Sequence, residues 1–162
     1  MSVALDGGDT HETCDVLWLQ SALFFVDVRV ERVSGVVRAC FAGTTTWAPP
    51  NLTWAHDLDI AAARAEDSGE VSWAGADLIE RGSGLVPGIG AAASYVEHWT
   101  RLPNDRPVRA ELLAGGGVAV RAGRHRLAIT PAPSGALTAT YRRLTPDGWR
   151  VELRVQAMVG SQ

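Results

Sequence analysis

The chain has 162 residues, 46% of them hydrophobic and 20% charged, which fits one globular domain with a sizeable core. Its net charge of -3 gives no electrostatic reason to expect nucleic acid, and no apolar run approaches the roughly 20 residues that span a bilayer. All 15 basic residues are arginine, which excludes Schiff-base, pyridoxal-phosphate and P-loop chemistry that depends on lysine.

The first 13 residues are polar, and we expect them to be disordered or loosely attached to a domain that covers residues 14–160. They carry acids and no cationic patch before an apolar run, which is not the pattern of a secretory signal peptide. We therefore expect a cytoplasmic protein. Cys14 and Cys40 form no C-x-x-C pair, and in that compartment we expect two reduced, buried thiols.

Beyond residue 13 the dominant period is two, which predicts strands with one buried face. In 23–33 the apolar side chains share one face, and they are Phe24, Val26, Val28 and Val30. The charged side chains of the same segment share the other face, and they are Asp27, Arg29 and Glu31. Ser34-Gly35 predicts a hairpin turn into a strand over 36–42, and Pro49-Pro50 predicts a loop over 45–51.

The remaining segments continue this pattern of short strands. A strand is expected over 52–60, then one helical turn or a wide loop over 61–66, then two strands within 70–81 around Gly75. After a Gly-rich link at 82–92, further strands are expected at 93–102, 107–113, 117–122, 125–130, 136–144 and 149–158. About nine or ten short strands without a long helix predict an all-β sandwich or barrel.

One strand favours the barrel. Alternation places Tyr95, Glu97, Trp99 and Arg101 on the same side, and a dry sandwich core would have to desolvate that row. A barrel of roughly eight or more strands can keep such side chains beside a small ligand. We therefore predict an antiparallel up-and-down, lipocalin-like (calycin) β-barrel of about 8–10 strands with a central pocket.

The same four residues are the best candidate site. Arg101 could clamp a carboxylate or phosphate with its planar fork, while Trp99 lines the pocket. Glu97, with a raised pKa in a low-dielectric site, could act as a general acid or base, and Tyr95 could assist it. The alternative is structural, namely a Glu97–Arg101 ion pair beside a packed tryptophan that closes the barrel.

Two further pairs are candidates. Asp27 and Arg29 extend the polar lining if they point inward, and form an ordinary solvated pair if they point outward. His56 beside Trp54 could shuttle protons or ligate a haem iron, or it could be a satisfied core histidine. Strand alternation sends His56 to one face and both Asp57 and Asp59 to the other, so we expect no metal site and no cofactor.

The order of several segments resembles a small protein family. The segments are LWLQSALFFVDVRV, FAGT, TWAHDLD, D-x-G-x-x-x-W with LIERG, and YVEHW-x-R, within residues 16–102. They look like the lipocalin-like (calycin) family of fungal kinase-interacting proteins and their uncharacterised bacterial relatives. The family pattern matches Asp27, Arg29, Trp54, Asp59, Glu80, Tyr95, Glu97, Trp99 and Arg101.

This resemblance implies an antiparallel barrel with a central cavity, and it brings no assigned reaction. The calycin fold also hosts decarboxylases, cyclases and isomerases that work without a cofactor, which is an analogy at the level of the fold. We expect a barrel that binds a small, partly apolar or aromatic molecule with one anionic group met by Arg101. The alternatives are a cofactor-independent enzyme that uses Glu97 or His56 with Tyr95, and a protein-interaction module with a filled barrel. We expect neither nucleic acid nor a membrane as a partner. The sequence does not decide between a monomer and a homodimer.

Overall fold

The computed structural model describes residues 2–5, 13–61, 66–85, 92–101 and 107–160. Across these ranges, strands make up almost all the regular structure, with one short 3-10 turn, η1 (Ala114–Gly116). The all-β class predicted from the alternating sequence is confirmed. No helix in the described ranges is long and apolar enough to cross a membrane.

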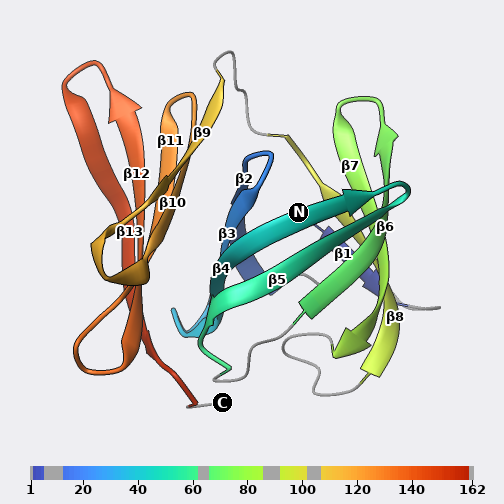
Figure 1. The fold of residues 1–162 in the computed structure, drawn as a ribbon, viewed down its shortest axis with the longest axis horizontal. Coiled ribbons are helices and arrows are strands. Elements are labelled where there is room, and N and C mark those ends of the chain that lie inside the picture. Colours follow the sequence, from blue (N-terminus) through green and yellow to red (C-terminus); the bar gives the residue numbers. More distant parts are fainter. Residues whose placement is uncertain (1, 6–12, 62–65, 86–91, 102–106, 161–162) are drawn as a thin grey trace.

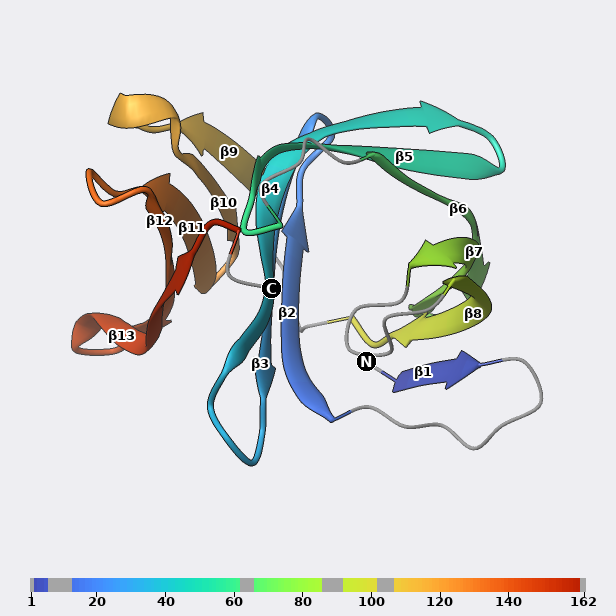
Figure 2. The same cartoon turned by 90° about the horizontal axis from the view of Figure 1, so that it is seen from below.

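Eight strands form the first sheet, in the order β1-β8-β7-β6-β5-β4-β3-β2, and all neighbours in it are antiparallel. They are β1 (Ser2–Leu5), β2 (Cys14–Gln20), β3 (Phe24–Glu31), β4 (Val37–Ala48), β5 (Asn51–Asp59), β6 (Glu66–Ala74), β7 (Asp77–Leu85) and β8 (Ala92–Trp99). From β2 to β8 each strand pairs with the next along the chain, as in an up-and-down meander. This sheet curls around an interior, with β1 and β2 at its two edges (Figure 2).

Five more strands form a second antiparallel sheet in the order β13-β12-β11-β10-β9. They are β9 (Val108–Leu112), β10 (Val118–Ala122), β11 (His125–Pro131), β12 (Ala136–Thr145) and β13 (Gly148–Met158). This sheet stands beside the first one, next to β2, β3 and β4 (Figure 1). The prediction of one barrel of about 8–10 strands is therefore wrong for the C-terminal strands, which form a sheet of their own.

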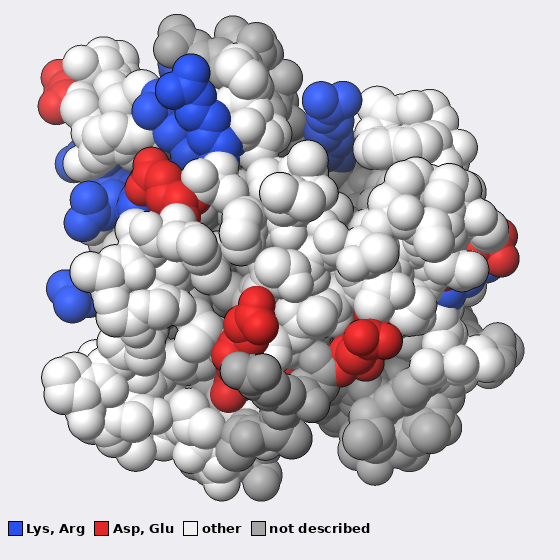
Figure 3. All heavy atoms as spheres, viewed as in Figure 1, with Lys and Arg blue, Asp and Glu red and all other residues white. Residues whose placement is uncertain are grey.

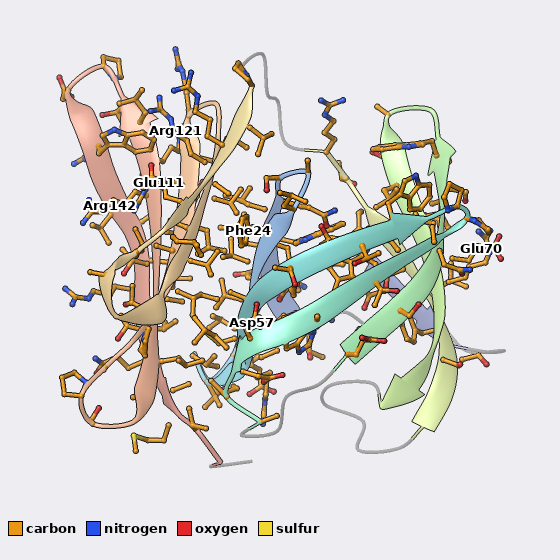
Figure 4. The ribbon with its side chains drawn as sticks, in the orientation of Figure 1. Phe24, Asp57, Glu70, Glu111, Arg121 and Arg142 are labelled. Carbon is orange, nitrogen blue, oxygen red and sulfur yellow. The ribbon has the colours of Figure 1, made fainter. Side chains whose placement is uncertain are left out.

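The main hydrophobic core lies between the two sheets. Val26 and Val28 on the outer face of β3 pack in one cluster with Val120, Leu127 and Ile129 from the second sheet, and all five are buried. Phe24 points into the same space (Figure 4). Because this apolar face of β3 packs outward, the opposite face, with Asp27 and Arg29, turns toward the interior of the curled sheet.

Several local expectations need correction. The segment 45–51 is not a loop, because β4 continues to Ala48 and the turn is reduced to Pro49-Pro50. Residues 2–5, expected to be disordered or loosely attached, form β1 along β8. The sequence pattern sets no bounds for β2, which the structure places at Cys14–Gln20. Residues 62–65 of the expected turn or loop and 86–91 of the expected link lie outside the described residues. The ends of both segments need correction, because β6 already begins at Glu66 and β7 continues to Leu85.

Candidate functional site

The concave face of the first sheet carries a row of polar and aromatic side chains. Trp18 of β2 pairs with Asp27 of β3, Asp27 with Phe41 of β4, and Phe41 with Asp59 of β5. Directly paired residues of neighbouring strands point to the same side of a sheet. Four strands therefore bring these side chains, distant in sequence, to one side of the interior.

Arg29 is held between two buried carboxylates. Its Nε donates to Asp27 Oδ1 at 3.3 Å, and its Nη1 donates to Glu97 Oε1 at 3.2 Å. The guanidinium also lies 5.8 Å from the centre of the Trp99 ring. Burial lowers the pKa of Arg29, but the two carboxylates outweigh burial and raise it above its ordinary value. Arg29 is therefore a fixed cation whose charge is already compensated by the protein.

Glu80 and Glu97 are directly opposite each other on β7 and β8, and both are buried. Glu80 accepts a hydrogen bond from the Tyr95 hydroxyl at 3.2 Å and another from Trp99 Nε1 at 3.0 Å. Burial, together with the nearby charges of Glu97 and Asp67, raises the pKa of Glu80 to about 8. Burial also raises the pKa of Glu97, against the opposing effect of Arg29. Glu80 is thus the carboxyl group that holds a proton at neutral pH.

Space for the Tyr95 ring comes from glycine on the neighbouring strands. Gly82 of β7 pairs with Tyr95, and a methyl group at this position would overlap the phenol ring and its oxygen. Gly69 of β6 pairs with Gly82 and would, with a methyl group, press on the Glu80 side chain. Two glycines side by side therefore let the tyrosine and the glutamate lie flat across the inner face.

His56 contacts Asp59, which corrects the expectation that these two residues lie on opposite faces. His56 Nδ1 lies 2.7 Å from Asp59 Oδ2, and the ring stacks on Phe41 with centres 4.2 Å apart. The cause is a β-bulge: Gly43 pairs with His56 and Ala42 with Leu58, so that Asp57 is an extra residue. The carboxylate fixes one ring nitrogen and leaves Nε2 as the group that could exchange a proton.

Three tryptophans meet on the same side of the interior. The Trp18 ring stands edge-on to Trp99, with centres 4.6 Å apart, and to Trp54 at 5.8 Å. Trp54 Nε1 donates to Gln20 Oε1 at 3.0 Å. Trp18 Nε1 is buried and has no hydrogen-bond partner in the described part of the chain. An unsatisfied buried donor costs free energy, so a ligand or water that offers an acceptor would be stabilised there.

Two cavities meet at these tryptophans. The inner one, next to Asp27, Arg29 and Glu80, has a volume of about 20 Å³, which is room for one water molecule. The outer one, at the mouth of the curled sheet, has a volume of about 710 Å³. Trp18 and Trp99 line both cavities and so stand between them.

Most of the predicted site residues do come together. The inward side chains are Asp27, Arg29, Trp54, His56, Tyr95, Glu97 and Trp99. Arg101 differs from this group, because it is exposed and lies at the mouth, where it lines the outer cavity. The alternative of a Glu97–Arg101 ion pair is wrong, since the partner of Glu97 is Arg29.

Four further residues line the inner cavity without being predicted as site residues from the sequence: Trp18, Phe41, Asp67 and Glu80. Trp18 lies in β2, for which the sequence pattern set no bounds. Its spacing of two residues from Val16 and from Gln20 places these three side chains on one face of a strand. Glu80 was matched only through the family pattern, and its pairing with Glu97 depends on long-range register. In the described ranges no group of three or more His, Cys, Asp or Glu side chains is arranged to hold a metal ion.

These features define a class: a β-rich protein whose curled antiparallel sheet surrounds a polar, tryptophan-lined interior. The sequence model for "Protein HRI1" matches residues 1–156, and the chain belongs to the HRI1 family. Its fold is similar to the crystal structure of the uncharacterized protein YLR301w from Saccharomyces cerevisiae, with a TM-score of 0.67 and 15% sequence identity. That match covers 95% of this chain and 82% of the yeast chain. No curated protein sequence matches significantly.

These comparisons support a family and a β-rich fold. Neither of them links the chain to lipocalins or calycins, to kinase-interacting proteins or to bacterial relatives, so those parts of the expected resemblance stay predictions. The yeast protein is itself uncharacterized and brings no activity to this chain.

Proposed function

We propose that this HRI1-family protein binds a small, partly apolar or aromatic molecule with one anionic group in the cavity at the mouth of the curled sheet. The observation that carries the proposal is the cavity of about 710 Å³, within the range of small-molecule sites. A lipocalin-like mode of binding is part of the same proposal, because curled antiparallel meanders are a common frame for interior ligands. A cytoplasmic location is also part of the proposal.

The lining favours an apolar or aromatic ligand. Trp47 and Trp73 both line the cavity and are 54% and 68% exposed, so two large aromatic side chains lie open at this cavity and add to one apolar patch. Leu52, Val71 and Leu78 complete an apolar wall. A flat ring system would bury much of this surface at low cost in conformational entropy.

The charge at the mouth favours an anionic group. Among the described side chains that line this cavity, Arg101 is the single charged one. Deeper in, Arg29 is already paired with the carboxylates Asp27 and Glu97. The ligand would therefore place its anionic end at Arg101 and its apolar body against Trp18 and Trp99.

The test uses 1-anilinonaphthalene-8-sulfonate, an aromatic monoanion whose fluorescence rises in apolar sites. We expect saturable binding with quenching of tryptophan fluorescence, weakened in Arg101→Gln and in Trp73→Ala. Arg81→Gln is the matched control, because Arg81 is exposed on β7 and does not line the cavity. Unsaturable binding, or equal binding by all variants, would exclude the mouth as the site.

A second candidate function is catalysis without a cofactor, favoured by the proton on Glu80 and by the His56–Asp59 pair. Glu97 and His56 would act as acid or base, with Tyr95 relaying the proton of Glu80. Since the inner cavity has room for only about one water molecule, Trp18 or Trp99 would have to move to admit a substrate. A ligand purified with the protein that exchanges carbon-bound hydrogen in heavy water, but not with Glu97→Gln, would support catalysis over binding.

The third alternative, an interaction module with a filled barrel, agrees with the small inner cavity but not with the large outer one. Failure of the sulfonate probe to bind, together with the absence of a ligand in the purified protein, would support this alternative over the other two.

A further inference from the structure

The net charge of -3 conceals a division of charge between the two parts of the chain. Residues 107–160, which form the second sheet, contain 8 arginines and 3 acids, a balance of +5. Residues 1–106 contain the other 7 arginines and 15 acids, a balance of -8. Such a division points to an electrostatic role for the second sheet.

Four of the arginines stand in one row across neighbouring strands. Arg109 of β9 pairs with Arg121 of β10, Arg121 with Arg126 of β11, and Arg126 with Arg142 of β12. At about 4.8 Å between strands, the row is about 14 Å long. The alternate residues Val120 and Leu127 are buried between the sheets, so the arginine row lies on the outer face.

The outer face offers these arginines little compensation. Arg126 donates to Glu111 at 3.2 Å, and Arg121 donates to the Gly123 carbonyl at 3.2 Å. The other acids of this sheet, Asp147 and Glu152, lie in the β12–β13 turn and on β13. Basic side chains gather over this sheet, with acidic groups among them and at its edge, and Arg121, Glu111 and Arg142 lie along it (Figures 3 and 4). Like charges directly opposite destabilise a sheet, so the row is costly unless an anion binds it.

The outer face is also concave. The guanidinium of Arg121 on β10 lies 5.0 Å from the centre of the Trp149 ring, although Trp149 is on β13, three strands away. Ala119 and Ala128, on the outer side of β10 and β11, are only 1% and 5% exposed, as expected for small residues at the floor of a hollow. The face is therefore a trough with small residues at its floor and Trp149 at one wall.

We propose that this trough, the arginine row with Trp149, binds single-stranded nucleic acid. The arginines meet successive phosphates, and Trp149, 38% exposed, offers a ring on which a base can stack. The concave shape disfavours a flat membrane, and the exposed aromatic ring adds a contact that an acidic peptide does not need. The inference is independent of the proposed ligand at Arg101, because neither the four arginines of the row nor Trp149 lines that cavity.

The test is fluorescence anisotropy with labelled oligothymidylate and the full chain, between about 50 and about 200 mM salt. Each phosphate contact contributes about -0.7 to the slope of log K against log salt concentration. We expect Arg109→Gln and Arg142→Gln each to weaken binding and to make the slope shallower by about 0.7. Trp149→Leu should lower affinity by about 5-fold or more, and leave the slope unchanged.

Arg81→Gln on the first sheet is the matched control and should bind like the parent protein, because it removes the same charge elsewhere. Circular dichroism of each variant separates lost binding from lost folding, and exposed Arg109 and Arg142 are safe to replace. The proposal is overturned by absent binding, by equal weakening in the control, or by polyglutamate binding as tightly as the oligonucleotide. The last result would assign the trough to an acidic protein.

Discussion

Glu80 and Glu97 place two buried carboxyl groups opposite each other, and the nearby Arg29 is bound to Glu97 and Asp27. The folded pKa of Glu80, about 8, lies above its value in the unfolded chain, so between these values the native state holds a proton that the unfolded state has lost. The contribution of Glu80 to stability therefore falls as pH rises through this window, by up to about 1.4 kcal/mol per pH unit.

Glu80→Gln removes this dependence. The amide can keep one acceptor for Tyr95 or Trp99 and never ionises. We expect thermal unfolding of the variant and of the parent to be similar near pH 5, and the variant to be more stable near pH 8. Glu70→Gln, on an exposed side chain in the middle of β6 (Figure 4), should show no such divergence. Parallel curves for Glu80→Gln and the parent would mean that Glu80 is ionised throughout.

At the scale of single elements, the bulge in β5 decides what His56 contacts. A methyl group at Gly43 would overlap the Ala55 carbonyl and approach the Asp57 amide nitrogen at 2.8 Å, and neither backbone group can move aside. Gly43→Ala should therefore reduce the free energy of unfolding by about 3 kcal/mol or more, or prevent folding. Urea unfolding measures this loss.

Gly35→Ala is the control for that variant. Gly35 sits at φ 70° in a turn, with nothing near its missing side chain, so the substitution should cost only about 1–2 kcal/mol. If Gly43→Ala costs no more than Gly35→Ala, the close approach at the bulge is not what requires glycine.

The same bulge marks a limit of prediction from the sequence. Strict alternation correctly groups Tyr95, Glu97 and Trp99, because β8 pairs with β7 in unbroken register. It fails for Asp59, because one inserted residue exchanges the faces beyond it. It also cannot say whether Asp27 and Arg29 point to solvent, since β3 is covered on both sides and both of its faces contain buried residues.

At the scale of the whole molecule, the sequence predicts nearly every C-terminal strand but not the sheet that each joins. The strands expected at 117–122, 125–130 and 136–144 all appear, with small shifts at their ends. Alternation is identical for a strand that closes a barrel and for one that packs on its outside. The arginine row cannot be predicted from the sequence for a related reason. Its members become neighbours only when strands β9 to β12 pair, and they are Arg109, Arg121, Arg126 and Arg142.

The core between the sheets should make the chain unfold as one unit. Leu127 of the second sheet is fully buried against Val26 and Val28 of the first, whereas Leu112 of the same sheet is 71% exposed. Leu127→Ala should cost about 2–5 kcal/mol in free energy of unfolding, and Leu112→Ala less than about 0.5 kcal/mol. Trp149 of β13 would add a signal from the second sheet, so these variants are made in a Trp149→Phe background. There the remaining tryptophans, all on strands of the first sheet, report on that sheet by fluorescence, and far-ultraviolet circular dichroism reports on both sheets. Because the deleted atoms belong to a core shared by both sheets, the two signals should shift together for Leu127→Ala. A tryptophan transition that stays in place while part of the dichroism melts earlier would show that the second sheet unfolds by itself.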